Sequence, residues 1–559
     1  MKRKVLFYLS LGLLLIVFII NNYADAELKE QDSNWTISKT SIYSSNEESF
    51  AEDNYVISPD KKRIAYAVKE TKEDSLIKSY IVLDGNKQND YLRVVRSTFA
   101  FSPNSQHFAY LALTKTEKVE DRKLLVIIDG NEEQIYPHYY VENDQRNVYY
   151  NVKPNFTFSP DSKHFVYSVI NAKEKRWFVV LDGKERKEYE GLGPAEISFT
   201  FSPDSRHLAY AACDNYKWFV VLDGKEDKLH DSIFCLTFSP DSQHFAYAAI
   251  EGSKSFMVID EKEQKSYDGI VDIPLTFSPD SQHFAYVARE GDKRFVVLDG
   301  KEGKWYDGIV DIPLTFSPDS QHFAYGAREG DKRFVVLDGK EQKKYDEIVD
   351  IPLTFSPDSQ HFAYAAIEGN KYFVVLDGKE GKQYDAIADS APVFSPDSQR
   401  LAYVAKEGEK WHTILDGEEQ PFLSFHFSKP ITGEPLLFKP IFSPDSQRFA
   451  YTARENNKSF IVMDGEKGKE YDLVTLLTFS PDSQHHVYLG GRYEKHIIRD
   501  LALPSGKFML IIDGKEQKEE QDSMFIDYFS AITFDTSESF YYSAIIDNTF
   551  YLIKHKLKK

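Results

Sequence analysis

Histidine recurs at one fixed place in this chain, and imidazole is the commonest metal ligand among protein side chains. It follows "SPDSQ" or a close variant at eight positions: His107, His164, His207, His244, His283, His322, His361 and His485. A metal site needs several ligands that converge on one ion, whereas these histidines come one to a repeat. We therefore interpret them as structural residues, and the sequence predicts neither a metal site nor a cofactor.

The aspartate of "IVDIP" provides a second set of candidates and occurs as Asp272, Asp311 and Asp350. Together with the acidic residues of nearby loops, Glu290 and Glu329 among them, these side chains could form an acidic surface patch. Such a patch would bind a cation or a basic partner. Solvated surface charge explains the same residues, and the sequence leaves both interpretations open.

The chain has two cysteines, Cys213 and Cys235, which fall at the same face of neighbouring repeats in the strand pattern described below. Export would permit a disulfide between them, provided that their Cα atoms come within bonding reach. Two buried thiols are the alternative.

Sequence signatures of common enzyme chemistry are absent. The chain has no G-x-S-x-G, H-E-x-x-H or C-x-x-C motif, no phosphate-binding loop and no calcium-binding EF-hand loop. We therefore predict a non-catalytic protein. The alternative is an enzyme, such as a glycan lyase or hydrolase, with a site assembled from loop residues that are not repeated.

All of these candidates belong to a repeated unit. The unit begins with an "SPD"-like turn, and from Ser239 to Ser395 the spacing between turns is always 39 residues. A degenerate twelfth copy begins at Ile532. A period of about 40 residues is typical of a four-stranded propeller blade. The first serine of the turn lies at residues 58, 102, 159, 202, 239, 278, 317, 356, 395, 443 and 480.

One unit shows how the sequence specifies four strands. Residues 312–318 form a short apolar run ending in proline (strand a), and "HFAYGARE" follows the turn as strand b. "RFVVLDG" is strand c, which ends in a hairpin signal, and "KKYDEI" is strand d. Strands a to c are apolar on both faces, whereas strand d is polar. This gradient predicts a blade with strand a at the ring centre and strand d at the outer rim.

The segment "FSPDSQHFAY" resembles the repeat signature of TolB-like, WD-repeat-like β-propellers. Two departures stand out: the glycine that usually follows the aspartate is serine here, and the Trp-Asp pair of true WD repeats is Leu-Asp, as at Leu298-Asp299. The resemblance covers most of residues 55–545 and implies an all-β propeller fold. It implies no particular partner.

The two ends of the chain predict how the propeller closes. The twelfth unit lacks a strand d, and the N-terminal segment "WTISKTSIYS" supplies a surplus strand that would complete it. Twelve units exceed the usual four to eight blades. We therefore expect two consecutive rings of five to seven blades, at 27–300 and 301–559, with one large ring as the alternative.

The N-terminus predicts export. Three basic residues precede an apolar run at 5–20, and Ala24-Asp25-Ala26 fits a cleavage site. Residues 1–26 are therefore a signal peptide or a membrane anchor, and the rest of the chain is expected to be periplasmic or extracellular. Lys plus Arg number 68 and Asp plus Glu 88, a net charge of −20. Such an acidic chain is a poor nucleic-acid binder.

Length variation points to the functional face. The a–b turns keep one length, whereas the b–c and d–a loops hold insertions at 136–156, 426–440 and 489–507. Variable loops on a rigid scaffold commonly carry function, although neutral drift explains them equally well. We predict a binding or scaffold protein whose partner is another protein or an envelope ligand.

Overall fold

The structure is a computed structural model. It describes residues 27–28, 35–44, 55–70, 78–114, 123–137, 156–171, 176–193, 199–271, 275–423, 440–493, 506–517, 532–546 and 549–558. These residues form twelve antiparallel sheets and contain no helix, and therefore none long and apolar enough to cross a membrane. The N-terminal segment 1–26 lies outside them.

Each sheet is one blade, and its two middle strands follow the expected pattern. Strand b of the twelve blades is β4 (Ile64–Glu70), β8 (Phe108–Leu113), β12 (Phe165–Asn171), β17 (Leu208–Asp214), β21 (Phe245–Glu251), β26 (Phe284–Glu290), β31 (Phe323–Glu329), β36 (Phe362–Glu368), β41 (Leu401–Glu407), β45 (Phe449–Glu455), β49 (His486–Tyr493) and β53 (Ser539–Ile546). Strand c is β5 (Lys78–Leu83), β9 (Lys123–Ile128), β13 (Arg176–Leu181), β18 (Lys217–Leu222), β22 (Lys254–Ile259), β27 (Lys293–Leu298), β32 (Lys332–Leu337), β37 (Lys371–Leu376), β42 (Lys410–Leu415), β46 (Lys458–Met463), β50 (Gly506–Ile512) and β54 (Thr549–Leu557).

Strands a and d flank this pair. Strand a is β3 (Tyr55–Ile57), β7 (Arg93–Phe101), β11 (Thr157–Phe158), β16 (Thr200–Phe201), β20 (Ser232–Phe238), β25 (Thr276–Phe277), β30 (Thr315–Phe316), β35 (Thr354–Phe355), β40 (Val393–Phe394), β44 (Ile441–Phe442), β48 (Leu473–Phe479) and β52 (Thr533–Thr536). Strand d is β6 (Asn86–Lys87), β10 (Asn131–Pro137), β14 (Lys184–Tyr189), β19 (Lys225–Glu226), β23 (Lys262–Glu263), β28 (Lys301–Glu302), β33 (Lys340–Glu341), β38 (Lys379–Glu380), β43 (Glu418–Leu423), β47 (Glu466–Lys467), β51 (Lys515–Glu516) and β2 (Trp35–Ser44).

The middle strands are buried on both faces because each sheet is packed between two others. In the seventh blade, Phe323 and Phe334 belong to the core shared with the sixth blade. Ala324 and Val335, the next residues along the same strands, belong to the core shared with the eighth blade. The alternation follows from the period of two in a strand, and it confirms the expectation of strands that are apolar on both faces.

The inner and outer edges differ in detail from the expected strands. Five blades have a split strand a, with a second short segment that also pairs with strand b: β15 (Gly191–Leu192), β24 (Gly269–Ile270), β29 (Gly308–Ile309), β34 (Glu347–Ile348) and β39 (Ala386–Ile387). The expected strand d "KKYDEI" is therefore wrong, because the strand d of that blade is Lys340–Glu341, which precedes it. Tyr345 bridges Arg333 at the outer edge of the seventh blade, while Glu347–Ile348 joins the eighth.

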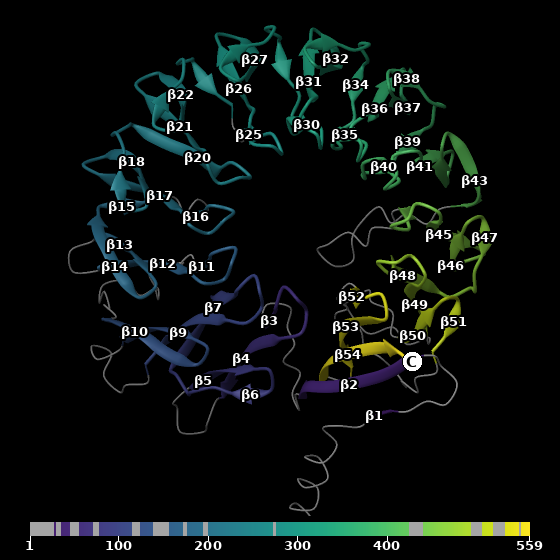
Figure 1. The fold of residues 1–559 in the computed structure, drawn as a ribbon, viewed down its shortest axis with the longest axis horizontal. Helices are drawn as coiled ribbons and strands as arrows, with labels where there is room; N and C mark the ends of the chain where they lie inside the picture. Colours follow the sequence, from purple (N-terminus) through teal and green to yellow (C-terminus); the bar gives the residue numbers. More distant parts are fainter. Residues whose placement is uncertain are drawn as a thin grey trace, which may run out of the picture.

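The twelve blades follow one another around a single ring (Figure 1). The expected division near Gly300 is not what the structure has, because the core that joins the sixth and seventh blades spans Ala285 to Val336 without interruption. Every unit has the same packing surfaces, so the sixth and seventh blades pack together in the same way as other neighbouring blades. The structure is thus one large ring, which the sequence analysis gave as the alternative.

The N-terminal strand completes the last blade, as the surplus segment predicted. β2 pairs antiparallel with β54 over nine residue pairs, from Trp35 with Leu557 to Ser44 with Thr549. The last sheet therefore has the order β1-β2-β54-β53-β52, where β1 is Glu27–Leu28. In Figure 1, purple β2 lies beside yellow β54. The exchange covers an edge of β54 that would otherwise expose unpaired backbone groups.

Removing residues 1–44 should therefore destabilise the fold more than removing residues 1–26. The nine paired residues of β2 are lost, and at about 0.5–1.5 kcal/mol for each hydrogen bond the free energy of unfolding should fall by roughly 5 kcal/mol. Urea unfolding followed by circular dichroism measures the difference. Equal stability of the two shortened chains would contradict closure by β2.

A buried histidine lies next to this closure. His555 of β54 has no exposed surface and stacks on Phe540 and Tyr542, with ring centroids 4.7 and 5.8 Å away. Burial lowers the pKa of His555 from 6.5 to about 3. The neutral imidazole is therefore the form that the folded chain holds. Protonation favours the unfolded chain, in which the pKa returns to its ordinary value.

We expect acid to weaken the native chain through His555. Neutral His555 makes its full contribution to the free energy of unfolding above pH 6.5, and this contribution is lost as the pH falls toward 3. At pH 5 the loss is about 2 kcal/mol. His555→Phe keeps the ring stack and removes the titration. Chemical unfolding at pH 7.5 and 5 should show the native chain losing about 2 kcal/mol more than the variant, and identical losses would exclude this role.

Candidate functional site

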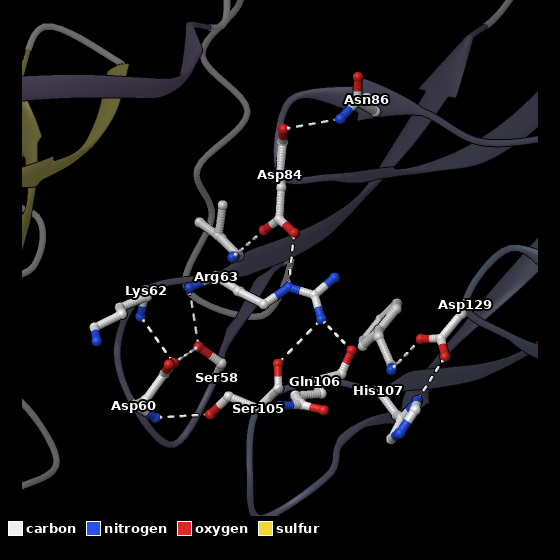
Figure 2. A network of polar contacts seen from close by, with 12 residues as sticks. Ser58, Asp60, Lys62, Arg63, Asp84, Asn86, Ser105, Gln106, His107 and Asp129 are labelled. Atoms are coloured by element: carbon white, nitrogen blue, oxygen red, sulfur yellow. Dashed lines mark hydrogen bonds and ion pairs between the residues drawn. The ribbon is translucent and has the colours of Figure 1, made fainter.

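One face of the ring carries the a–b and c–d turns, and the repeated polar residues meet there. In the first blade, the Ser58 hydroxyl donates to Asp60 Oδ1 at 2.7 Å and accepts the Arg63 N–H at 2.9 Å. The Asp60 N–H donates to Oγ of Ser105, in the turn of the second blade, at 2.9 Å (Figure 2). The turn thus fixes its own shape and also binds the next blade.

The contact between the turns is repeated around the ring. The N–H at the aspartate position donates to the second serine of the following turn at 2.9–3.0 Å in ten successive blades. The donors are Asp60, Asn104, Asp161, Asp204, Asp241, Asp280, Asp319, Asp358, Asp397 and Asp445. The bond from Asp280 to Ser320 crosses the position at which two rings would have separated.

This bond gives the second serine of the turn a structural role. The second serine has a positive φ, +64° at Ser320, a conformation that glycine adopts without strain. Ser320 is 4% exposed, and its Oγ accepts the Asp280 N–H at 3.0 Å. The hydroxyl therefore supplies an inter-blade hydrogen bond that glycine could not make.

The repeated histidines pair with the aspartate of the c–d turn in their own blade. His322 Nδ1 lies 2.8 Å from Asp338 Oδ2, and Asp338 Oδ1 accepts the Phe323 N–H at 2.9 Å. The same pair occurs at all eight histidines, with Nδ1 to oxygen distances of 2.7–2.8 Å. In three blades arginine takes the histidine's place, as Arg63, Arg400 and Arg448.

Serine, histidine and aspartate thus meet in most blades without forming a nucleophilic triad. The Ser317 hydroxyl donates to Asp319 and accepts the backbone N–H of His322, so no imidazole activates it. The hydrogen bond from Ser317 lowers the pKa of Asp319, which keeps that carboxylate ionised. Among the described residues, no group of three His, Cys, Asp or Glu side chains could hold a metal ion.

The opposite face joins the blades through a different aspartate. Asp307 follows the outer-edge tyrosine of the sixth blade and accepts both Lys293 Nζ and the N–H of Gly330, each at 2.6 Å. Gly330 lies in the b–c hairpin of the seventh blade. The lysine and the N–H bond together lower the pKa of Asp307, with the N–H contributing more. This face carries the b–c and d–a loops, as the sequence predicted.

The outer rim holds a third set of inter-blade contacts. A lysine in strand d of one blade, or just after it, lies 2.5–2.8 Å from a glutamate of the next strand d in seven places: Lys187–Glu226, Lys228–Glu263, Lys265–Glu302, Lys304–Glu341, Lys343–Glu380, Lys382–Glu419 and Lys469–Glu516. Exposed pairs of this kind contribute about 0–1 kcal/mol each. Their main effect is to cancel charge at the outer rim, and they add little to the free energy of unfolding.

The proposed acidic patch is interleaved with lysines. Asp272 lies outside the described residues, whereas Asp311 and Asp350 are exposed and form no ion pair with any residue that the structure describes. Glu290 pairs with Lys254 at 3.1 Å, and Glu329 pairs with Lys344. These lysines reduce the net charge of the loops, so a binding role for the patch stays a prediction.

The two cysteines are not joined. Both Cys213 and Cys235 are half-buried thiols, and the structure has no disulfide between them. Cys213 lies opposite Gly191 within its own sheet, while Cys235 occupies a bulge of β20 with φ +55°. Desolvation is the first cause that raises the pKa of Cys213, ahead of the nearby carboxylates, so its thiol is not activated.

Residues that break the repeat were missed by sequence reasoning, although their departure from the consensus was a usable signal. Arg186, Arg206 and Leu208 line one cavity between the third and fourth blades. Most blades have Gln or Gly, Gln and Phe at these three places. His230 stands where most blades have a tyrosine, and it is 2% exposed against Phe256.

Known proteins resemble this chain only at low similarity. No protein-family model matches the chain, and no curated protein sequence does. Structures similar to it include TolB from Acinetobacter baumannii, with 15% identity, TM-score 0.21, and coverage of 50% of this chain and 78% of that one. The β-propeller domain of the Trilobed protease from Pyrococcus furiosus has 14% identity, TM-score 0.22, and coverage of 51% and 97%. The Dos1 propeller has 12% identity, TM-score 0.25, and coverage of 60% and 88%. The propeller assignment rests on the blades themselves.

Two substitutions at Ser320 separate its hydrogen bond from its backbone strain. Ser320→Ala loses the acceptor for Asp280 and keeps the positive φ, so it should destabilise by roughly 1–3 kcal/mol. Ser320→Gly loses the same bond but relieves a left-handed conformation that costs about 1–2 kcal/mol, and the greater chain entropy of glycine offsets only part of that gain, so it should cost less than the alanine variant. Thermal unfolding of both variants measures the difference. A glycine variant less stable than the alanine variant would contradict this account.

Proposed function

We propose that this protein is an exported, non-catalytic binding or scaffold protein that presents variable loops on a rigid ring. The observation that carries the proposal is the contrast between its two faces. The turns of one face are copied from blade to blade and bound to each other, as at Asp280 and Ser320. The b–c and d–a loops of the other face hold the large insertions.

The internal use of the repeated polar groups supports a binding role over catalysis. His322 Nδ1, Asp338 and the Ser317 hydroxyl form hydrogen bonds within the two turns of their own blade. A propeller enzyme would need its acid, base or nucleophile from residues that are not repeated. Finding such a group would favour the alternative, a glycan lyase or hydrolase.

The residues of the loop face fit a protein partner. Tyr216 lies in the β17–β18 hairpin and is 93% exposed. It has φ +60°, a conformation that is unusual for a bulky side chain. Tyrosine is enriched among residues that dominate protein interfaces, and strained residues cluster at functional sites. The insertions expected to complete this surface lie mostly outside the described residues.

Two further parts of the proposal rest on the sequence. The repeats are a TolB-like type in which serine replaces the usual glycine. Residues 1–26 direct the chain to the periplasm or the cell exterior, or anchor it in the membrane, and would be its one contact with lipid. Protease accessibility on intact producing cells tests the location.

Loop trimming tests the binding face. β10 extends to Pro137, and the last b–c insertion lies between Tyr493 and Gly506, so the cuts fall at 138–155, 426–439 and 494–505. A chain shortened at all three should keep its cooperative unfolding and lose at least tenfold in affinity for proteins captured from the native envelope. Pull-down followed by a titration of the captured partner measures this.

Substitutions on the turn face provide the matched control. Gln282, Gln321 and Gln360 are exposed turn residues, and replacing all three by alanine should leave the affinity within about twofold. If binding survives loop trimming and is lost in the glutamine variant, the partner binds the turn face and the proposal is wrong. If the native chain is folded and captures no partner, the binding role is rejected.

A further inference from the structure

The groove between the third and fourth blades contains a cavity of about 230 Å³ on the turn face. In Figure 1 these blades are the neighbouring sheets β11–β14 and β15–β19. Apolar side chains form much of its wall: Val179, Leu208 and Tyr210 are 0–6% exposed, and Phe201 is half-buried. The site lies on the face opposite the variable loops and is distinct from the surface proposed above.

Two arginines line the cavity, although the chain as a whole has a net charge of −20. Arg186 comes from β14 of the third blade and forms no ion pair with any described residue. Arg206 comes from the a–b turn of the fourth blade. Its side chain is 82% exposed, and its nearest carboxylate oxygen, on Asp204, is 3.7 Å away. Both guanidinium groups are therefore accessible to an added anion.

The next groove around the ring shows that these charges are specific to this one. Between the fourth and fifth blades, Asp227 stands in place of Arg186 and Gln243 in place of Arg206. The scaffold therefore requires neither arginine. Burial raises the pKa of Tyr210 to about 12, and the positive charge of Arg186 opposes that rise. The charge of Arg186 thus acts on Tyr210, a residue of the cavity wall.

Carboxylates near the cavity offset part of its positive charge, as at Arg206, whose Nε lies 3.7 Å from Asp204 Oδ2. Asp223 is the carboxylate among the lining residues, and it is engaged by His207 Nδ1 at 2.7 Å and by the Leu208 N–H at 2.9 Å. His164 makes the same contact with Asp182 at 2.8 Å. Both imidazoles contact their aspartates through Nδ1, so Nε2 takes no part in these contacts.

A smaller side chain at Leu208 provides the space. Phe323, its counterpart in the seventh blade, packs against Phe316 with ring centroids 4.6 Å apart. Leucine at this place leaves the room that part of the aromatic ring would fill. The cavity thus joins two positive charges to an apolar wall, a combination that suits a ligand with an acidic head and an apolar body.

We propose that this groove, here called the arginine groove and defined by Arg186, Arg206 and Leu208, binds a small organic anion. A phosphate or carboxylate group would contact the two arginines, and an aromatic or aliphatic group would lie against Leu208 and Phe201. Arginine binds both kinds of head group in bidentate geometry. Phenyl phosphate and benzoate serve as probes that distinguish the two heads.

Calorimetric titration of the full chain with each probe tests the proposal. At least one probe should bind the native chain more tightly than inorganic phosphate does. The double variant Arg186→Gln/Arg206→Gln should weaken that binding about tenfold or more, as expected when charge-assisted hydrogen bonds are lost. Leu208→Phe should weaken the probe similarly and leave the weaker binding of inorganic phosphate within about twofold, because it fills the apolar part alone.

Lys187→Gln is the matched control. Lys187 is adjacent in β14 but pairs at the rim with Glu226 at 2.6 Å, so its loss should change affinity less than twofold. Arg206→Gln alone restores the residue that the next blades have, and it serves if the double variant fails to fold. No binding of either probe at about 10 mM, or equal affinity in the native chain and the arginine variants, would overturn the proposal.

Discussion

Each sheet of this ring buries both of its faces, and the rest of the structure depends on that constraint. A strand such as β31 places Phe323 in one core and Ala324 in the next, so a blade separated from either neighbour would expose apolar surface. Stability is therefore a property of successive pairs of blades, as in other repeat architectures. The constraint also explains why four copies of "TFSPDSQHFAY" are identical: a change in a middle strand disturbs two cores at once.

Polar contacts between each blade and the next supplement this apolar packing. The Asp280 N–H reaches forward to Ser320 on one face, Asp307 reaches forward to Gly330 on the other, and Lys304 pairs with Glu341 at the rim. Each blade is thereby held at three places, whichever blade follows. Positions used in this way are not available for a ligand. The residues that remain for function are those that differ between units, such as Arg186 and Tyr216, and those of the long loops.

Sequence reasoning predicted the local structure well because the repeat shows each signal many times. The spacing of the turns predicted the blades, the gradient from apolar to polar strands predicted which edge lies outside, and the surplus strand at Trp35–Ser44 predicted the closure with β54. The number of rings could not be predicted, since equal units contain no signal that stops the ring at six. The split of strand a at Gly308–Ile309 was missed because the equivalent residues of the next unit, Glu347–Ile348, were assigned to the end of strand d. The arginine groove was missed because each of its residues looks like ordinary variation until the two blades are brought together.

Closure by β2 and β54 has a consequence for the order of events during biosynthesis. The first strand of the ring to leave the ribosome pairs with the last, more than 500 residues later in the chain. Throughout synthesis the growing arc has an exposed sheet at its leading end, and β2 lacks the long pairing with β54. Contacts of such long separation form slowly, and unpaired edges are prone to aggregation. A cell that makes this protein must therefore protect an incomplete ring until its final residues appear.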